Sequence, residues 1–320
     1  MQTDFDSRGR GKPRLRLLVL GAAAGGGFPQ WNCLCETCRL FWEGDERVRA
    51  STQSSIAVTA DDENWLLLNA SPDLRQQIVD RAAMRPSATA KARAGALRSS
   101  PIASVLITNG DVDHTAGLLT IREKQNFTLY ATGGVHDIIA ANPVFQVLDP
   151  DHVTKTRIVP GSPFEPVPGL TAELFSVPGK VPLYLETGTV DVGEESEMTV
   201  GVRLSAHGRT IYYIPGCAHV PDSLKERVAG ADALLFDGTV FVDEEMKEAG
   251  VGVKTGRRMG HMPISGEGGS LSIFDDAKIG RRVYIHINNT NPIWIDGSEA
   301  KKTVEAAGWE VAYDGMDLSL

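Results

Sequence analysis

The feature that most constrains the fold is a short apolar run that leads into a cluster of metal-binding side chains. Ser104-Val105-Leu106-Ile107 has the length and β-branched content of a buried strand. Asp111, Asp113 and His114 follow it closely, where open α/β folds place their sites. A helix cap at Asp113 is the simpler alternative, but capping requires neither His114 nor Asp111. The pattern therefore favours a metal site.

The overall composition is that of an ordinary globular protein, with 42% hydrophobic and 23% charged residues among 320. The formal net charge of −9 argues against nucleic acid or an anionic membrane as the main partner. After the basic N-terminus, Leu17-Leu18-Val19-Leu20 is too short for the apolar segment of a secretory signal. No apolar stretch approaches the roughly 18 residues of a membrane span. We therefore expect a cytoplasmic protein with no membrane partner.

The order of predicted elements favours a single α/β domain over residues 1–320. Short strands with occasional helices predict two packed sheets with helices outside. Ser71 is predicted to cap a helix over 73–83. Residues 1–14 are expected to form a flexible tail, and the Ala- and Arg-rich residues 86–100 an exposed loop. Besides the run described above, strands are predicted over 15–20, 54–59, 65–69, 127–131, 170–177, 199–205, 210–214, 233–236 and 283–287.

Three closely spaced cysteines, Cys33, Cys35 and Cys38, indicate a second metal site. Three thiolates at this spacing can surround one tetrahedral zinc ion if a further ligand comes from elsewhere. A zinc site closed by protein ligands is structural. Cys217 is distant in sequence, and nothing in the sequence makes it the missing ligand.

His286 follows the apolar residues Val283-Tyr284-Ile285 and precedes an asparagine-rich turn. A histidine in a core strand is equally well explained by a hydrogen bond to a backbone carbonyl. At a strand end, however, His286 can join Asp113 and His114. Two imidazoles and one carboxylate on one face of a metal leave adjacent positions open, as in the non-haem iron oxygenases.

Other candidate site residues follow other predicted strands. His261 lies in a glycine-rich turn and is a candidate acid, base or ligand. Lys180 can hold a substrate carboxylate, and Asp237 can bind or orient a metal, although an exposed turn explains either residue in isolation. The glycine run at residues 21–27 is not followed by an amphipathic helix. It therefore indicates a loop beside a site more than a dinucleotide-binding loop.

Together these motifs resemble the metallo-β-lactamase superfamily, and within it a family that acts in biosynthesis of the redox cofactor pyrroloquinoline quinone (PQQ). The resemblance extends along essentially the whole chain and implies an αββα sandwich of two mixed sheets with outer helices. The motifs that carry it are GGGFPQWNCxCxxC at 25–38, TNxxxDHTxGLL at 108–119, LFDGT at 235–239, MGHMPIS at 259–265 and HINNTNP at 286–292.

The resemblance also implies which metal site the chain has kept. The superfamily carries His-x-His-x-Asp-His after a strand, with further ligands at later strand ends. Three positions that correspond to histidines of its first zinc site hold other residues here: Asn109, Asp111 and Lys180. The ligands of the second site are all present: Asp113, His114 and His286. Cys217 corresponds to the aspartate that bridges the two metals.

The family resemblance further implies an iron-dependent, O₂-using hydroxylation of the tyrosine ring of a precursor derived from Glu and Tyr. Fe(II) is the expected active-site metal, with Asp111, Lys180, Asp237 and His261 as catalytic residues. Zinc is the expected structural ion, and Asn289 stands where related phosphodiesterases close the cysteine site with a histidine. The alternatives are a hydrolase and a non-catalytic carrier of PQQ or its precursor. Expected partners are O₂ and a small peptide containing Glu and Tyr, and a homodimer is the candidate assembly.

Overall fold

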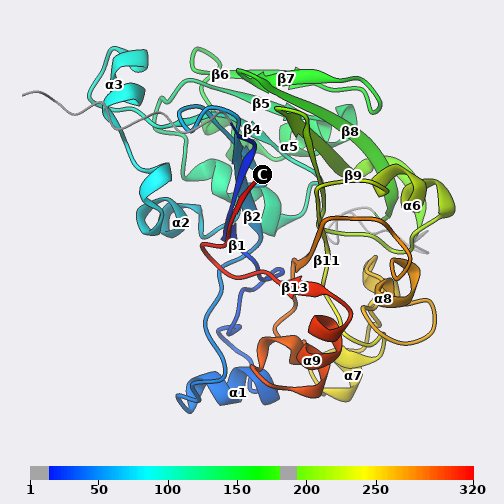
Figure 1. Cartoon of the computed structure of the whole chain (residues 1–320). Coiled ribbons are helices and arrows are strands. Elements are labelled where there is room, and N and C mark those ends of the chain that lie inside the picture. Colours follow the sequence, from blue (N-terminus) through cyan, green and yellow to red (C-terminus); the bar gives the residue numbers. More distant parts are fainter. Residues whose placement is uncertain (1–13, 181–192) are drawn as a thin grey trace, which may run out of the picture.

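In the computed structural model, which describes residues 14–180 and 193–320, the strands form two seven-stranded sheets. The sheets lie face to face, and helices cover their outer faces (Figure 1). Each sheet thus buries one face against the other sheet and the second face against helices. This arrangement is the αββα sandwich that the sequence predicts.

The first sheet brings the two ends of the described chain together. β1 pairs antiparallel with β14, with Arg16 opposite Ser319. β3, β4, β5 and β6 run parallel, so the loop that follows β4 lies at their shared carboxyl edge. Across the sheet the strands are β14 (Asp317–Ser319), β1 (Arg16–Gly21), β2 (Ser55–Thr59), β3 (Trp65–Leu68), β4 (Ile102–Leu106), β5 (Phe127–Ala131) and β6 (Val153–Arg157).

The second sheet contains the other strand ends that build the site. β10, β11 and β12 run parallel, with Tyr213 beside Leu235 and Leu235 beside Val283. The ends of β11 and β12 therefore place Asp237 and His286 at one edge. Across the sheet the strands are β13 (Trp309–Val311), β12 (Arg281–Ile285), β11 (Ala233–Asp237), β10 (Arg209–Ile214), β9 (Glu194–Ala206), β8 (Leu170–Gly179) and β7 (Phe164–Val167).

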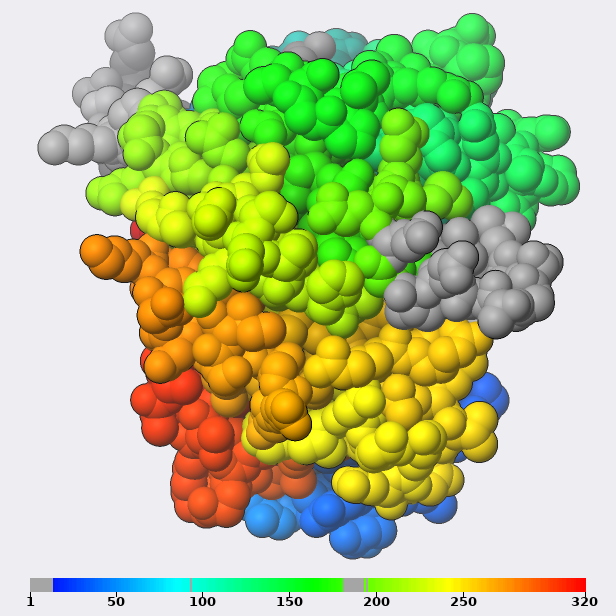
Figure 2. Space-filling view, turned by 90° about the vertical axis from the view of Figure 1, so that its right-hand side faces the viewer, coloured from blue at the N-terminus to red at the C-terminus, as the bar shows by residue number. Residues whose placement is uncertain are grey.

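Helices pack on the outer faces through a few apolar side chains each. Leu74 and Val135 pack against the first sheet, and Leu224 and Val304 against the second. The α-helices are α1 (Glu36–Trp42), α2 (Leu74–Asp80), α3 (Ala88–Ala94), α4 (Val112–Thr115), α5 (Gly133–Ala141), α6 (Asp222–Val228), α7 (Glu245–Glu248), α8 (Ser270–Ile273) and α9 (Glu299–Ala306). The 3₁₀ helices are η1 (Ala82–Met84), η2 (Ala116–Leu119), η3 (Pro143–Val147), η5 (Arg257–Met259) and η6 (Pro292–Trp294). α1, α7 and α9 gather at the lower end of the molecule (Figures 1 and 2).

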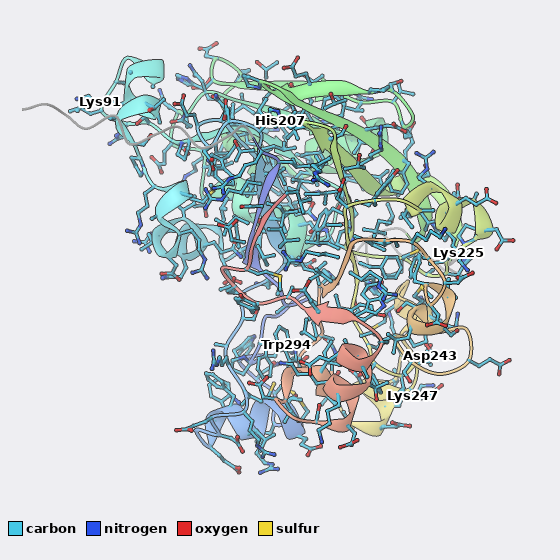
Figure 3. The ribbon with its side chains drawn as sticks, in the orientation of Figure 1. Lys91, His207, Lys225, Asp243, Lys247 and Trp294 are labelled. Atoms are coloured by element: carbon cyan, nitrogen blue, oxygen red, sulfur yellow. The ribbon has the colours of Figure 1, made fainter. Side chains whose placement is uncertain are left out.

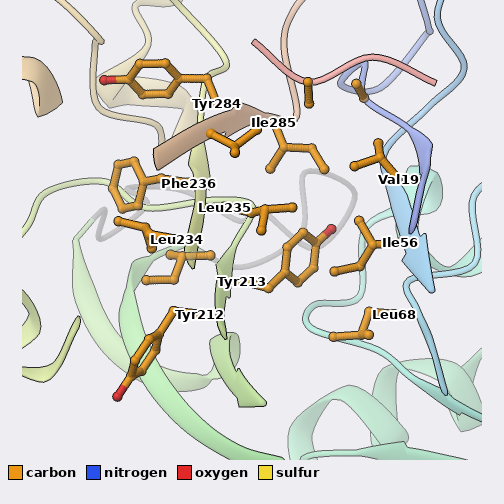
Figure 4. Close-up of a cluster of buried hydrophobic side chains, with 14 of the residues drawn as sticks. Val19, Ile56, Leu68, Tyr212, Tyr213, Leu234, Leu235, Phe236, Tyr284 and Ile285 are labelled. Atoms are coloured by element: carbon orange, nitrogen blue, oxygen red, sulfur yellow. The ribbon is translucent and has the colours of Figure 1, made fainter. Parts of the chain in front are cut away.

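The main core lies between the sheets. Ile56 and Leu68 of the first sheet face Tyr213, Leu235 and Ile285 of the second (Figure 4), and all five are fully buried. The Tyr213 hydroxyl lies 3.3 Å both from the Ser54 hydroxyl and from the Asn69 side-chain amide, so this buried polar group has partners on the opposite sheet. Truncating Leu235 to alanine would cost roughly 2–5 kcal/mol.

Two helix predictions are wrong in detail. Residues 86–100 are largely exposed, as expected, but they contain α3 instead of forming a loop throughout. The Ser87 hydroxyl caps its first turn, and Gly95 ends it at a φ of +64°, so local capping stabilises an alanine-rich helix that has little hydrophobic periodicity. Ser71 does not cap α2, because its hydroxyl bonds to the Gln77 side chain and the helix begins at Leu74.

Of the predicted flexible tail at 1–14, the structure describes Arg14. Residues 1–13 lie outside the described ranges, so the prediction of a tail is not tested. Along residues 14–180 and 193–320, no helix combines the length and the apolar character that a membrane crossing requires.

Candidate metal centre

The site is built where β4, β11 and β12 end. Asp113 lies in the first turn of α4, whereas Asp111 occupies the N-cap position without a side-chain capping bond. The helix-cap explanation for Asp113 therefore fails. After β12 the backbone turns at His286, which adopts a φ of +59°, a conformation that side-chain-bearing residues rarely take. Backbone strain of this kind is concentrated at functional sites.

Asp113, His114 and His286 converge as a possible metal-binding set. Each offers one ligand atom, and the three atoms lie within 4.8 Å of one another. The Asp113 Oδ2 lies 3.2 Å from His286 Nε2 and 3.7 Å from His114 Nε2. The structure thus brings together the three residues that the sequence proposed as ligands.

The surroundings of His114 fit a metal ion. Its side chain is 1% exposed, and neither ring nitrogen has a hydrogen-bond partner. A buried imidazole without a partner is costly, because its nitrogens have lost water and gained nothing. An ion between His114 Nε2 and the Asp113 carboxylate would supply the missing interaction.

The charge states of Asp113 and His114 also suit a cation. Burial alone would raise the pKa of Asp113, but the neighbouring His114 and His286 hold that pKa well below its usual range. Burial lowers the pKa of His114 to about 4, so its ring is neutral at pH 7. Burial acts to lower the pKa of His286, but its hydrogen bond to Asp113 and the surrounding carboxylates raise it. An ionised carboxylate and a neutral imidazole are the metal-binding forms.

The Thr239 hydroxyl contacts three side chains of the site: those of Asp237, His261 and His286. The hydroxyl lies 2.9 Å from His286 Nδ1, 2.7 Å from Asp237 Oδ1 and 3.1 Å from His261 Nδ1. When the hydroxyl accepts a hydrogen bond from the His286 Nδ1–H, Nε2 is the ring nitrogen that can bind an ion beside Asp113. Such outer partners fix the tautomer and the orientation of a metal-binding histidine.

Asp237 and His261 form a second pair beside this set. His261 Nδ1 lies 2.8 Å from Asp237 Oδ2, and its ring stacks on that of His286 with centroids 5.2 Å apart. Asp237 is completely buried and also accepts hydrogen bonds from the backbone N–H groups of Cys217 and Thr239. The sequence placed His261 and Asp237 in or next to the metal shell, and in the structure both lie beside His286.

A cavity of about 270 Å³, here named the metal pocket, opens in front of these residues. Gly25 is part of its wall, and a Cβ atom at that position would lie 3.5 Å from the Asp113 carboxyl. The glycine run therefore does form a loop beside the site. The pocket is lined by Ala24, Gly25, Asn109, Asp111, Asp113, His114, Lys180, Pro215, Thr239, Lys254, Met259, His261, His286 and Asn288.

The resemblance predicts that three residues stand in the places of histidines of the first superfamily site. Asn109, Asp111 and Lys180 all line the metal pocket. Burial and the charge of Asp113 raise the pKa of Asp111, while the positive charge of Lys180 opposes that rise. Cys217 is buried, its thiol donates to the backbone oxygen of His219, and it does not line the pocket.

Cys33, Cys35 and Cys38 form a separate buried cluster at the start of α1, with their sulfur atoms within 4.8 Å of one another. The Asn289 side-chain amide lies 3.3, 3.5 and 3.4 Å from the three sulfurs in that order. The sequence suggested Asn289 as the closing residue, and its side chain lies against all three sulfurs. Amide nitrogen and oxygen are distinguished only by their contacts, so a rotated amide would present its oxygen to an ion.

The thiols themselves fit a metal ion. The hydrogen bond from Cys38 lowers the pKa of Cys35 to about 5, whereas the bond to Cys35 raises that of Cys38. One thiolate is thus stabilised by its neighbours even without an ion, and a cation would stabilise all three. Among the described residues, this is the cluster with three sulfur ligands.

Sequence reasoning missed three residues of the site. Thr239, Lys254 and Asn288 line the metal pocket but carry no recognisable ligand motif. Thr239 had the best signal, since it follows Asp237-Gly238 directly after a buried strand. His207 does not line the pocket and bonds instead to the backbone oxygen of Ala60 (Figure 3).

Comparison with known proteins identifies the family. A family model described as a beta-lactamase superfamily domain matches residues 64–287. Coenzyme PQQ synthesis protein B of Methylobacterium sp. (strain 4-46) is 54% identical over 306 residues, which cover 96% of this chain and 100% of that protein. The chain belongs to the coenzyme PQQ synthesis protein B family. Its relative of that name in Rhizobium meliloti (strain 1021) is 56% identical, with 96% of this chain and 98% of the relative covered.

Solved structures agree with this assignment. The crystal structure of Zn(2+)-bound PqqB from Methylobacterium extorquens is 57% identical in sequence, covers 95% of this chain and 100% of that chain, and superposes with a TM-score of 0.92. A diphosphatase from the PhnP family has a TM-score of 0.65 at 21% identity, covering 96% of this chain and 98% of its own. The similarity to the diphosphatase shows that the two proteins share a fold.

Proposed function

We propose that the protein acts in the biosynthesis of pyrroloquinoline quinone as an iron-dependent oxygenase that hydroxylates the tyrosine ring of a Glu- and Tyr-derived precursor. Family membership supports the pathway, since the relatives carry the name coenzyme PQQ synthesis protein B. The observation that carries the reaction type is the compact set of one carboxylate and two imidazoles, Asp113, His114 and His286. This set is typical of non-haem Fe(II) oxygenases.

The residues present fit a single resident ion, as the unpartnered ring of His114 indicates. Asp113, His114 and His286 would hold it. Fe(II) bound there supplies the capacity to bind and activate O₂ next to the substrate. Thr239 would keep His286 in the ligand tautomer, because its hydroxyl accepts a hydrogen bond from the Nδ1–H group.

His261 is the residue best placed to move a proton. Its Nδ1 donates to the buried Asp237 carboxylate, which leaves Nε2 as the proton acceptor on the pocket wall. We propose that Nε2 takes the phenolic proton of the tyrosine substrate. Asp111 and Lys180 bind the polar ends of the same molecule, the former its ammonium group and the latter a carboxylate.

The reaction is balanced as follows. A ring C–H bond of the tyrosine is replaced by C–OH, with one oxygen atom coming from O₂. The second oxygen atom leaves as water, which requires two protons and two electrons from an external two-electron reductant. Oxidation of the resulting catechol by a second O₂ molecule, which takes up the two electrons and two protons and leaves as H₂O₂, would give a quinone.

A hydrolase is the second candidate, and one observation favours it. Asp237, His261 and His286 also offer ligand atoms within 4.8 Å of one another, so a second ion has a possible position. The Asp237 carboxylate, however, already accepts hydrogen bonds from two backbone N–H groups, the Thr239 hydroxyl and His261. A second ion would have to displace some of them. Hydrolysis by a hydroxide ion held between two metals is therefore less favoured than oxygenation at one metal.

The test is anaerobic reconstitution of the full chain with Fe(II), followed by addition of O₂, ascorbate and a Glu-Tyr peptide. We expect O₂ uptake and a product heavier by one oxygen atom, detected by mass spectrometry. Uptake should fail when Zn(II) replaces Fe(II). Cleavage of esters or phosphodiesters under nitrogen, without any O₂ uptake, would instead support the hydrolase. Binding of PQQ or its precursor with neither activity would support the carrier.

A further inference from the structure

A second cavity lies on the outer face of the first sheet, at the opposite edge from the metal ligands. It has a volume of about 420 Å³ and is here named the outer pocket. Ile102 and Phe127, the first residues of β4 and β5, line it, whereas Asp113 and His114 follow the other end of β4. Among the described residues, none lines both the outer pocket and the metal pocket. The larger apolar side chains of the outer pocket are those of Ile78, Met84, Leu97, Ile102, Ile121 and Phe127.

The described residues leave the outer pocket open. Leu97 lines it and is 84% exposed, so this large apolar side chain remains in contact with water. Ser99 also lines the pocket but is 8% exposed, and within the described ranges its hydroxyl has no hydrogen-bond partner. A buried hydroxyl without a partner costs free energy, and an exposed apolar side chain beside an open apolar pocket marks a surface that another molecule covers.

The chain around the outer pocket is basic. Residues 81–100 contain five arginines and lysines and no carboxylate, in a chain whose formal net charge is −9. Arg98 lines the pocket, and Lys91 lies on the neighbouring α3, where it is exposed (Figure 3). Within residues 14–180 and 193–320, neither of these two side chains takes part in an ion pair. The carboxylate of the pocket wall, that of Glu123, lies 3.3 Å from the Arg122 guanidinium. The outer pocket thus combines an apolar wall with an excess of positive charge around it.

These features favour an acidic polypeptide over a membrane, a nucleic acid or a second copy of the chain. A membrane-bound helix needs large apolar residues on one face, whereas α3 consists of alanine, threonine, lysine and arginine. Single-stranded nucleic acids stack their bases on accessible aromatic rings, but Phe127, the aromatic residue among the described lining residues, is 5% exposed. A two-fold contact between copies would place one basic surface against another. A concave apolar pocket instead suits one protruding side chain of a protein partner.

We propose that the outer pocket binds an acidic segment of a partner protein, which inserts one aromatic or branched apolar side chain into the pocket. Leu97 and the apolar wall bury this anchor, and Arg98 and Lys91 pair with carboxylates that flank it. A polar group of the segment bonds to the Ser99 hydroxyl. A buried anchor supplies much of the binding free energy of an interface, while complementary charge selects the partner and speeds association. Binding at the outer pocket is independent of the reaction at the metal pocket.

The test is fluorescence anisotropy of labelled peptides with the full-length, zinc-loaded protein. The probe is the peptide Glu-Asp-Phe-Asp-Glu. A second peptide replaces its phenylalanine by alanine, and a third replaces its acidic residues by glutamine and asparagine. The variants are Leu97→Ser, which shortens the apolar wall, and Arg98→Glu, which reverses a charge. Val159→Ser and Arg49→Glu are the matched controls, because both alter exposed residues that do not line the outer pocket. All four positions are exposed, so each variant should fold.

We expect the phenylalanine peptide to bind about tenfold more tightly than either altered peptide, since each of those lacks the anchor or the charges. Arg98→Glu should weaken its binding about tenfold, because a like charge replaces an opposite one, and Leu97→Ser about fivefold. The two controls should change it less than about twofold. Equal affinity for the phenylalanine and alanine peptides, equal losses in the controls, or no binding by the unmodified chain would overturn the proposal. Binding to vesicles of phosphatidylserine and phosphatidylcholine, or a dimer lost in Arg98→Glu, without peptide binding would overturn it in favour of a membrane or a second copy.

Discussion

The buried carboxyl group of Glu245, which contacts the segment after His286, gives a quantitative prediction. Glu245 is 5% exposed, and its two oxygens accept hydrogen bonds from the Thr290 hydroxyl and the Phe241 N–H, both at 2.6 Å. These bonds favour the ionised form, but burial outweighs them and raises the pKa of Glu245 from 4.5 to about 7. Thr290 directly follows Asn289, so this carboxyl supports the loop that also carries His286.

The pKa difference converts into a pH-dependent stability. Between about pH 4.5 and pH 7 the folded protein keeps Glu245 protonated while the unfolded chain ionises it. The folded state then binds more protons, so the free energy of unfolding falls as pH rises through this window. The contribution of Glu245 is complete below pH 4.5 and lost above pH 7. A difference of about 2.5 in pKa corresponds to about 3 kcal/mol.

The assay is urea unfolding of the unmodified protein and of Glu245→Gln at pH 5, 6, 7 and 8 in saturating zinc. Glutamine cannot ionise, so its stability relative to the unmodified chain should improve by up to about 3 kcal/mol between pH 5 and pH 8. Glu244→Gln, at an exposed neighbouring position, should show no such trend. The contributions of other titrating groups, including the zinc ligands, cancel when the stability of the unmodified protein is subtracted from that of Glu245→Gln. A difference that stays constant from pH 5 to pH 8 would refute the reasoning.

The remaining predictions concern the metal sites and the substrate. Cys35→Ser should lose one zinc ion per chain and lower the melting temperature, since zinc binding contributes to folding; retained zinc with unchanged stability would reject the cysteine site. His286→Ala should lose the active-site metal and keep the cysteine zinc, as counted by elemental analysis. Thr239→Val, which removes the hydroxyl at nearly constant shape, should weaken active-site metal affinity about 10- to 100-fold in competition with a chelator. Lys180→Ala should weaken Glu-Tyr binding about tenfold by calorimetry, and unchanged affinity would remove Lys180 from the substrate site.

The sequence was most informative where a buried strand ends in a polar residue. β11 reads ALLFD and β12 ends in the apolar residues VYI, so their ends could be located, and with them Asp237 and His286. The strands that were not predicted lie toward the sheet edges. β6 reads VTKTR, with one buried position, and β14 has three residues, so pairing with a neighbour and not a burial pattern defines them.

The polar network could not be predicted in the same way. Thr239 acts through contacts with two histidines and a carboxylate that come from different segments, and no spacing in the sequence encodes such a meeting. Asn289 could be named only through its distance from His286 in the family pattern, since an asparagine is rarely a zinc ligand. Its contact with three sulfurs depends on the docking of α1 against the loop, where the Thr37 hydroxyl donates to the Asn289 backbone oxygen.

The contact between the cysteine cluster and Asn289 also sets an order of assembly on the ribosome. Cys33 and Asn289 are separated by 256 positions, a stretch that takes roughly 10–50 s to synthesise at about 5–20 residues per second. During that interval the thiols have emerged but the amide that covers them has not been made. The active-site set is complete only once His286 has also been translated. The three cysteines therefore become available to an ion before the complete set of Asp113, His114 and His286 does.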